Sequence, residues 1–152
     1  MRILMVCLGN ICRSPIAEGV LLQKVKERGL DWIVDSAGTE TYHIGEAPHK
    51  FSQKICLAHG IDISGQRARR FTTADLKKFD KIYAMAEDVY DEIKEIVGSA
   101  DMTNVDLFMN ELRPGSNEPV PDPYYGGEDG FKKVYGMIDK TCDVIIEKYK
   151  QV

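Results

Sequence analysis

The chain lacks any hydrophobic run near the roughly 20 apolar residues that a membrane-spanning helix needs. Its apolar start, residues 2–6, is too short for a secretory signal peptide, so we expect none. Positive charge is not in excess either: the net charge is −4 and the pI is about 5.4, which argues against nucleic acid as the main partner. These absences predict a cytoplasmic protein that binds neither a membrane nor nucleic acid.

Cysteine and histidine are also scarce. Four cysteines in 152 residues suit a reducing compartment, and we expect Cys56 and Cys142 to be buried structural thiols. The three histidines have no ligand-like spacing with the cysteines, so the sequence predicts no metal site. We expect His43, His49 and His59 on the surface or at helix ends.

The composition is that of an ordinary globular protein, with 43% hydrophobic and 29% charged residues. There are no internal repeats, low-complexity tracts or long linkers, and the length suits one core. We therefore expect a single domain that spans residues 1–152.

Strand-like and helix-like patterns alternate along the chain. Alternation of this kind predicts an α/β fold, in which a four-stranded parallel sheet carries helices on both faces and ligands bind at the carboxyl ends of the strands. The predicted strands are Ile3–Val6, Trp32–Asp35, Lys81–Met85 and Asn104–Phe108, and the predicted helices are Pro15–Arg28, Pro48–His59, a short turn from Thr72, Glu87–Val97 and Glu128–Tyr149.

The run from Cys7 to Pro15 joins the first predicted strand to the first predicted helix. Backbone N–H groups of a loop in this position converge at the positive end of the helix dipole and bind a tetrahedral oxyanion. Gly9 and Asn10 are the residue types that best accept the left-handed angles of such a loop. Arg13 adds a planar cation that matches two phosphate oxygens. No Gly-Lys-Ser/Thr follows the glycine, which excludes a Walker-type phosphate loop.

The same electrostatic field acts on Cys7, the first residue of the loop. A cysteine beside a cation or a helix N-terminus is favoured as the thiolate, so we expect a nucleophile held below the bound phosphorus. A strand-end cysteine is more often an inert core residue. The combination of Cys7 with Asn10, Arg13 and Ser14 at one strand-to-helix junction favours the catalytic interpretation. Ser14 is expected to cap the helix, with Pro15 at its first position.

The run Val6 to Glu18, with its Cys-x5-Arg-Ser pattern from Cys7 to Ser14, resembles the low-molecular-weight protein tyrosine phosphatases, and the likeness extends over the whole chain. The resemblance implies a flavodoxin-like fold with the active-site loop after the first strand. It also implies metal-independent hydrolysis of phosphotyrosine esters through a cysteinyl phosphate on Cys7, with no cofactor. The expected substrate is a phosphotyrosine protein or an aryl phosphate, and inorganic phosphate is a product.

Besides the nucleophile, the reaction needs an acidic group that protonates the leaving oxygen. The candidate is Asp122, between Pro121 and Pro123, which stiffen the backbone around it. From the residues alone, a capping role in a solvent loop is equally plausible. The resemblance favours Asp122 as general acid, and then as general base toward water. It also implies that Tyr124 and Tyr125 line the pocket.

The resemblance assigns further roles around the loop. The segment from Glu40 to Gly45 supplies one wall, where the ring of Tyr42 would stack on a phenyl ester. Ile11 favours the tyrosine branch, because arginine phosphatases of the family tend to carry Thr there. The phosphate loop and its support are Leu8, Gly9, Asn10, Ile11, Cys12 and Ser14.

Three of these loop residues have specific expected roles. Asn10 holds the loop by its amide, and Ser14 donates its hydroxyl to the Cys7 sulfur. The resemblance implies that Cys12 can form a disulfide with Cys7 under oxidation, which protects the nucleophile. The chain departs from the pattern at Gln66, where many relatives carry His, and at Ala86, where an acid is common.

The basic cluster Arg67–Arg70 is either a solvated turn or a guide for acidic substrate segments.

Three alternatives remain beside a tyrosine phosphatase. A thiol-based arsenate reductase needs relay cysteines after the third strand, and residues 83–100 contain none. A silent phosphate-binding module would be expected to lack Cys7 or Asp122. A phosphoarginine phosphatase keeps the Cys7 chemistry, but Ile11 and Tyr42 weigh against it.

Overall fold

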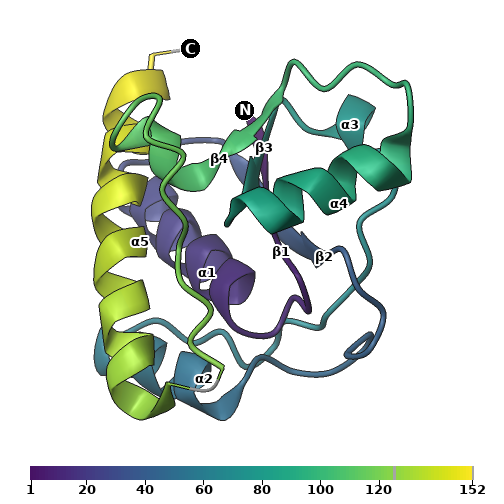
Figure 1. Cartoon of the computed structure of the whole chain (residues 1–152). Helices are drawn as coiled ribbons and strands as arrows, with labels where there is room; N and C mark the ends of the chain where they lie inside the picture. The colour runs from purple at the N-terminus through teal and green to yellow at the C-terminus, as the bar shows by residue number, and fades with distance from the viewer. Residues whose placement is uncertain (125, 152) are drawn as a thin grey trace.

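The computed structural model describes residues 1–124 and 126–151. Its centre is a four-stranded parallel sheet in the order β2-β1-β3-β4 (Figure 1). The predicted sheet is thereby confirmed. The strands are β1 (Arg2–Cys7), β2 (Ile33–Gly38), β3 (Lys81–Ala84) and β4 (Val105–Leu107).

Helices cover both faces of this sheet, as alternating strands and helices require. One face carries α1, α2 and α5, and the other carries α3 and α4. A 3-10 turn, η1, follows β4 and has no counterpart in the prediction. The bounds are α1 (Arg13–Glu27), α2 (Lys50–Ala58), α3 (Asp75–Lys78), α4 (Glu87–Val97), η1 (Phe108–Glu111) and α5 (Gly127–Tyr149).

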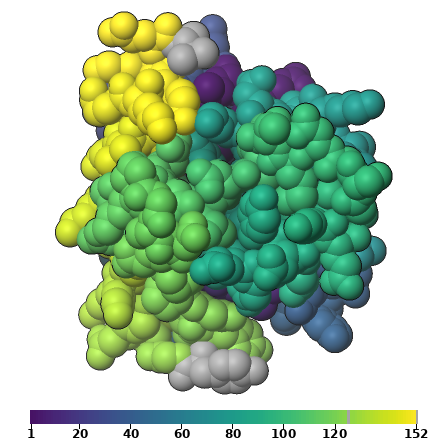
Figure 2. All heavy atoms as spheres, turned by 45° about the horizontal axis from the view of Figure 1, so that its top comes forward, coloured from purple at the N-terminus to yellow at the C-terminus, as the bar shows by residue number. Residues whose placement is uncertain are grey.

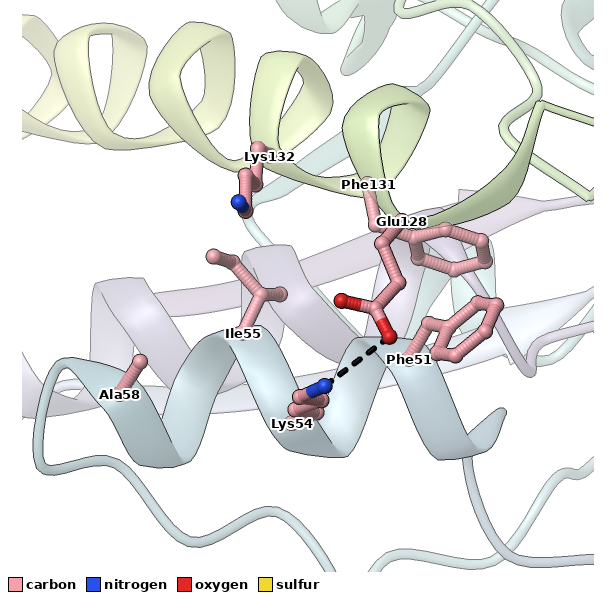
Figure 3. Close-up of a pocket in the computed structure, with 7 residues that line it drawn as sticks. All are labelled: Phe51, Lys54, Ile55, Ala58, Glu128, Phe131 and Lys132. Atoms are coloured by element: carbon pink, nitrogen blue, oxygen red, sulfur yellow. Dashed lines mark hydrogen bonds and ion pairs between the residues drawn. The ribbon is translucent and has the colours of Figure 1, made fainter.

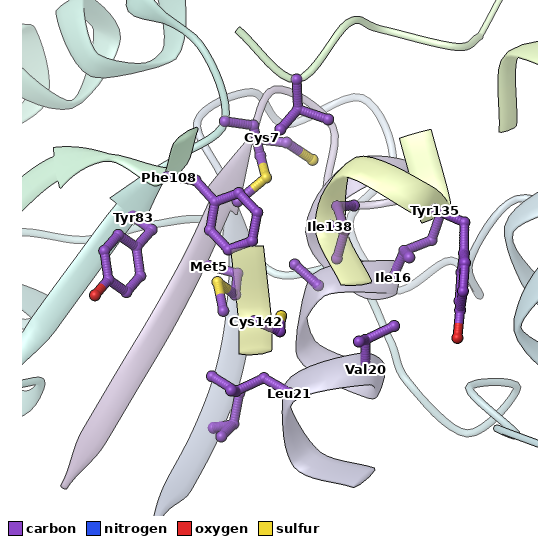
Figure 4. Packing of buried hydrophobic residues seen from close by; sticks show 14 of the residues in the cluster. Met5, Cys7, Ile16, Val20, Leu21, Tyr83, Phe108, Tyr135, Ile138 and Cys142 are labelled. Carbon is purple, nitrogen blue, oxygen red and sulfur yellow. The ribbon is translucent and has the colours of Figure 1, made fainter. Parts of the chain in front are cut away.

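The two cores follow from the alternation of side chains along the buried strands. Ile3 and Met5 of β1 belong to the core that includes α1 and α5, where Figure 4 shows Met5, whereas Leu4 and Val6 belong to the core that includes α4. All four are fully buried. Burying each such side chain stabilises the fold by about 1.5–3 kcal/mol relative to leaving it exposed. Because the side chains of β1 alternate in direction, the strand packs against helices on both of its faces.

Helix α1 begins earlier than predicted. It starts at Arg13, and Cys12 precedes it without a side-chain cap, so the prediction that Ser14 is the N-cap is wrong. The reason is that the Ser14 hydroxyl is bonded elsewhere, to Asn10 and Cys7. The predicted stop is confirmed, because Gly29 follows the helix with a φ of 64°.

The carboxyl ends of β1 and β2 are tied together. The Thr39 N–H donates to the Cys7 carbonyl at 3.1 Å, and the Glu40 N–H donates to the Leu8 carbonyl at 2.9 Å. At Gly38 a Cβ atom would come within 2.6 Å of the Leu8 oxygen, so only glycine allows this approach. The segment after β2 therefore lies directly against the loop after β1.

Among the described residues, no helix is long and apolar enough to span a bilayer.

Candidate active site

A pocket of about 360 Å³ opens at the carboxyl ends of the strands. Three segments form it: the loop after β1, the segment after β2, and the proline-rich segment before α5. Its lining consists of Cys7, Leu8, Gly9, Ile11, Cys12, Arg13, Glu40, His43, Asp122 and Tyr124. The structure thus brings together most of the residues predicted from the sequence. Asn10 and Ser14 lie buried next to this lining.

Two predicted wall residues are not in this lining. Tyr42 is 80% exposed, and its neighbour His43 lines the pocket instead. Tyr125 lies outside the described residues. The sequence prediction selected the correct wall segment and missed Glu40 and His43 within it. The Nδ1 of His43 lies 3.0 Å from the Glu46 carboxylate, which orients its ring.

Cys7 is 2% exposed and forms the base of the pocket. Its Sγ lies 3.0 Å from the Ser14 Oγ. That hydroxyl already accepts a hydrogen bond from the Asn10 Nδ2 at 2.8 Å, so its own hydrogen is available to the sulfur. A hydrogen bond of this kind stabilises a thiolate more than a thiol.

Asn10 is the centre of this arrangement. Its Nδ2 also donates to the Ser36 Oγ at 2.9 Å, and its Oδ1 accepts the Arg69 N–H at 3.0 Å. It has a φ of 57°, a left-handed value that asparagine tolerates better than most residues. The expected scaffold role agrees with these contacts, which extend beyond the loop to β2 and residue 69.

Gly9 has a different role from the one predicted. It is not among the residues with positive φ. A Cβ atom at this position would approach the His43 Cδ2 to 2.9 Å. Glycine therefore makes room for the pocket wall.

The network continues from Ser36 to Glu18 of α1. The Ser36 hydroxyl donates to the Glu18 Oε1 at 2.6 Å. Burial raises the pKa of Glu18 to about 7, and the hydrogen bond from Ser36 opposes that rise. A titratable carboxyl group is thus linked to the nucleophile through Ser36, Asn10 and Ser14.

Cys12 differs from Cys7 although both are buried. Burial raises the pKa of the Cys12 thiol to about 12, and the neighbouring Cys7 adds to the rise. Cys12 is therefore protonated at neutral pH. All four cysteines are free thiols in this structure, and Cys56 and Cys142 are buried as predicted.

Arg13 and Asp122 meet across the pocket. The Arg13 Nη1 donates to the Val120 carbonyl at 3.1 Å, and its Nη2 lies 3.8 Å from the Asp122 Oδ2. The Arg13 side chain is buried, whereas that of Asp122 is 46% exposed. The Asp122 Oδ1 also accepts the Tyr124 N–H at 3.0 Å, which orients the carboxylate in its turn.

The other two histidines lie at helix ends, as predicted. His49 caps α2 by accepting the Phe51 N–H at 3.1 Å, and His59 follows the last turn of the same helix. The His49 ring also contacts Tyr124 edge-on, with 5.7 Å between the ring centroids. Among the described residues, no group of three or more His, Cys, Asp or Glu side chains could hold a metal ion.

Comparison with known proteins identifies the family. The family model described as low molecular weight phosphotyrosine protein phosphatase matches residues 2–152. The chain belongs to this family.

Individual relatives agree with that assignment. The low molecular weight phosphotyrosine protein phosphatase of Schizosaccharomyces pombe is 39% identical over 137 residues, which cover 88% of this chain and 87% of the relative. The low molecular weight protein-tyrosine-phosphatase YfkJ of Bacillus subtilis is 35% identical over 155 residues, which cover 99% of this chain and 98% of the relative. The crystal structure of YfkJ superposes with a TM-score of 0.92 over 99% of this chain and 95% of its own.

The same fold also occurs in a structure named as a Drosophila arginine phosphatase. It has a TM-score of 0.90 and 31% sequence identity, and the match covers 99% of this chain and 97% of that one. The fold is therefore shared by phosphatases named for different phosphorylated residues.

Proposed function

We propose that the chain is a protein tyrosine phosphatase that forms a cysteinyl-phosphate intermediate on Cys7. The observation that carries this proposal is the position of the Cys7 sulfur, 3.0 Å from the Ser14 hydroxyl at the base of a pocket that Arg13 and Asp122 also line. The names of the relatives, which are protein-tyrosine phosphatases, support the same reaction.

In the first step, the Cys7 thiolate attacks phosphorus and forms an S–P bond. The P–O bond to the aryl oxygen breaks, and Asp122 gives that oxygen its proton. Arg13 and the backbone N–H groups of the loop stabilise the equatorial oxygens as charge shifts in the transition state. Ser14 stabilises the sulfur before attack.

In the second step, Asp122 accepts a proton from water as the water oxygen attacks phosphorus. The S–P bond breaks, the electron pair returns to the Cys7 sulfur, and inorganic phosphate leaves. The hydrogen bond from Ser14 makes that sulfur a better leaving group. These two steps need no cofactor, because Arg13 and the backbone N–H groups of the loop stabilise the charge on the phosphate oxygens.

The proposed substrate is a phosphotyrosine protein or an aryl phosphate. Tyr124 lines the pocket and offers an aromatic surface, and Ile11 adds an aliphatic one. We assign Tyr42 to the rim, where its exposed ring would contact residues of a peptide on either side of the phosphotyrosine. Phosphoarginine is the second candidate, because the Drosophila structure shares this fold.

Two further assignments rest on the cysteines. Four free thiols favour the cytoplasm as the compartment. Cys12 is proposed as the partner that forms a disulfide with Cys7 under oxidation, which would protect Cys7 from irreversible products.

The test is steady-state hydrolysis of three matched peptides that carry phosphotyrosine, phosphoarginine or phosphoserine, without added metal, by wild type and Cys7→Ser. We expect phosphotyrosine to dominate and the variant to be inactive. Preference for phosphoarginine would retain the Cys7 chemistry and overturn the roles of Ile11 and Tyr42. Activity in the Cys7→Ser variant would overturn the assignment of Cys7 as the nucleophile.

A further inference from the structure

A second groove of about 470 Å³ runs between α5 and the segment that leads to Asp122. Figure 1 shows that segment descending along α5, and Figure 2 shows it at the surface beside the helix. The lining residues are Met109, Leu112, Arg113, Glu118, Pro119, Pro121, Lys132, Lys133, Gly136, Met137 and Lys140. We call this the α5 groove.

The floor of the α5 groove is apolar. Its apolar lining residues are Met109, Leu112 and Met137, together with Pro119 and Pro121. Methionine side chains are flexible and polarisable, so such a floor accepts apolar side chains of different shapes.

The rim of the groove is positively charged, in a protein whose net charge is −4. Its single carboxylate among the lining residues, Glu118, pairs with Arg113 at 2.6 Å. Lys132, Lys133 and Lys140 form no ion pair within the described part of the chain.

Three carboxylates close to these lysines in the sequence pair with other lysines, whereas Asp129 is in none of the ion pairs among the described residues. Asp139 and Asp143 both pair with Lys24 of α1, and Glu128 pairs with Lys54 of α2. Lys132 also lies in the field of the Glu128 carboxylate, so Lys133 and Lys140 are the two lysines best placed to attract an external anionic group.

Gly136 of α5 presents no side chain to the groove. Gly136 lies within α5, where glycine costs roughly 0.5–1 kcal/mol relative to alanine. No contact inside the protein requires it, because a Cβ atom there would meet nothing within 4 Å. The space in front of Gly136 is therefore open.

The groove adjoins the active site through the backbone. Pro121 lines the groove, and the next residue, Asp122, lines the catalytic pocket. Val120 between the two prolines accepts a hydrogen bond from Arg13. A segment bound in the groove would therefore lie beside the general acid.

The hollow between α2 and α5 provides a contrast. It is small, about 80 Å³, and apolar between Phe51 and Phe131 (Figure 3). The Lys54–Glu128 pair spans the hollow at 2.9 Å. Lys132 lines both cavities, whereas Lys133 and Lys140 line the α5 groove and not this hollow, and the α5 groove also contains Pro121 of the acid segment.

We propose that the α5 groove docks an acidic segment of the protein substrate, with carboxylates on the lysines and an apolar side chain on the methionine floor. This inference rests on the proposed phosphatase function. From Lys132 to Lys140 the helix rises about 12 Å, which matches roughly four extended residues of a peptide.

The binding test uses a fluorescently labelled, unphosphorylated peptide of alternating Glu and Leu, measured by fluorescence polarisation. The groove variants are Lys133→Glu with Lys140→Glu, and Gly136→Phe, which fills the floor. Matched controls are Lys77→Glu with Lys94→Glu on the opposite face of the sheet, and Gly136→Ala, which adds only a Cβ. We expect both groove variants to weaken binding at least about tenfold, by loss of charge or of space, and both controls to bind like wild type.

Docking would be overturned by equal weakening in the Lys77/Lys94 control, which would show unspecific attraction, or by equal competition from a single-stranded oligonucleotide, which would show a general anion surface. Absence of binding to wild type would also overturn it.

The kinetic test joins the same Glu-Leu segment to either side of a phosphotyrosine and compares kcat/KM with Ser-Gly counterparts. On one side at least, we expect the acidic segment to raise kcat/KM several-fold in wild type and not in the groove variants. Turnover of a free aryl phosphate should be unchanged in all variants. If wild type did not hydrolyse the aryl phosphate, the phosphatase function itself would be refuted. Equal kcat/KM for the acidic and the Ser-Gly peptides in wild type would refute docking alone.

Discussion

The base and the rim of the catalytic pocket are built differently. At the base, Cys7, Asn10 and Ser14 are buried and joined by side-chain hydrogen bonds of 2.8–3.0 Å. At the rim, Asp122 and Tyr124 are roughly half exposed and Tyr42 is almost fully exposed. The base has one arrangement that its bonds enforce, and we propose that it holds the nucleophile. The more exposed rim carries the proposed general acid and has room to select the substrate.

The largest effect is expected at the base, from Cys7→Ser. Serine is not ionised at neutral pH, so kcat should fall by on the order of 10⁴ or more. The matched variant Cys12→Ser should lose less than about tenfold, because the Cys12 thiol is protonated and is not the nucleophile. Steady-state assays with an aryl phosphate measure both. Comparable losses in the two variants would remove the distinction between the cysteines.

At the rim, Asp122→Ala tests the general acid. For phenyl phosphate, whose leaving group is poor, kcat should fall by about 10²–10³, because the leaving oxygen receives no proton. For a nitrophenyl ester, whose leaving group needs little protonation, the loss should be much smaller. A loss that does not vary with the leaving-group pKa would contradict the role.

The third prediction concerns the rigidity of the base. Asn10→Ala places alanine at a φ of 57° and leaves the partly buried Arg69 N–H without its partner, so the free energy of unfolding should fall by about 2–4 kcal/mol. Asn117→Ala is the control, since Asn117 has a φ of 52° in an exposed turn. It should cost about 1–2 kcal/mol. Denaturant unfolding measures both, and equal losses would show that the Asn10 network contributes nothing.

The base should also make stability depend on pH through Glu18. Its pKa of about 7 in the folded state exceeds the ordinary value of 4.5, so between these values the folded protein binds more protons than the unfolded chain. Stability should therefore fall as pH rises from 4.5 to 7, by about 1–3 kcal/mol, and level off above. In Glu18→Gln this decrease should be absent when unfolding is measured across that range. An unchanged slope would contradict the assignment.

The smallest effects are expected from the two neighbouring rings of the rim. His43→Ala should raise KM for a small aryl phosphate about two- to threefold, or by less than 1 kcal/mol, because His43 lines the pocket. Tyr42→Ala should leave that KM unchanged and affect only a phosphopeptide. The reverse pattern would make Tyr42 the pocket wall, as the sequence first suggested.

The same contrast explains what the sequence could predict. The strands and most helices follow from local hydrophobic period, and the phosphate loop is a short contiguous run, so its members could be named before the fold was known. The start of α1 was misplaced because Ser14 bonds to side chains that only the fold brings near. His43 was missed because its place depends on how the segment after β2 packs on Gly9, a contact between distant parts of the chain.

The most direct test of the account locates the covalent phosphate. Enzyme mixed with a phosphotyrosine peptide is quenched within the first turnover, digested, and fragmented by mass spectrometry to separate Cys7 from Cys12. The account predicts phosphate on the Cys7 sulfur, and none on Cys12 or in the Cys7→Ser variant. Phosphate on Cys12, or turnover without any covalent phosphate, would contradict it.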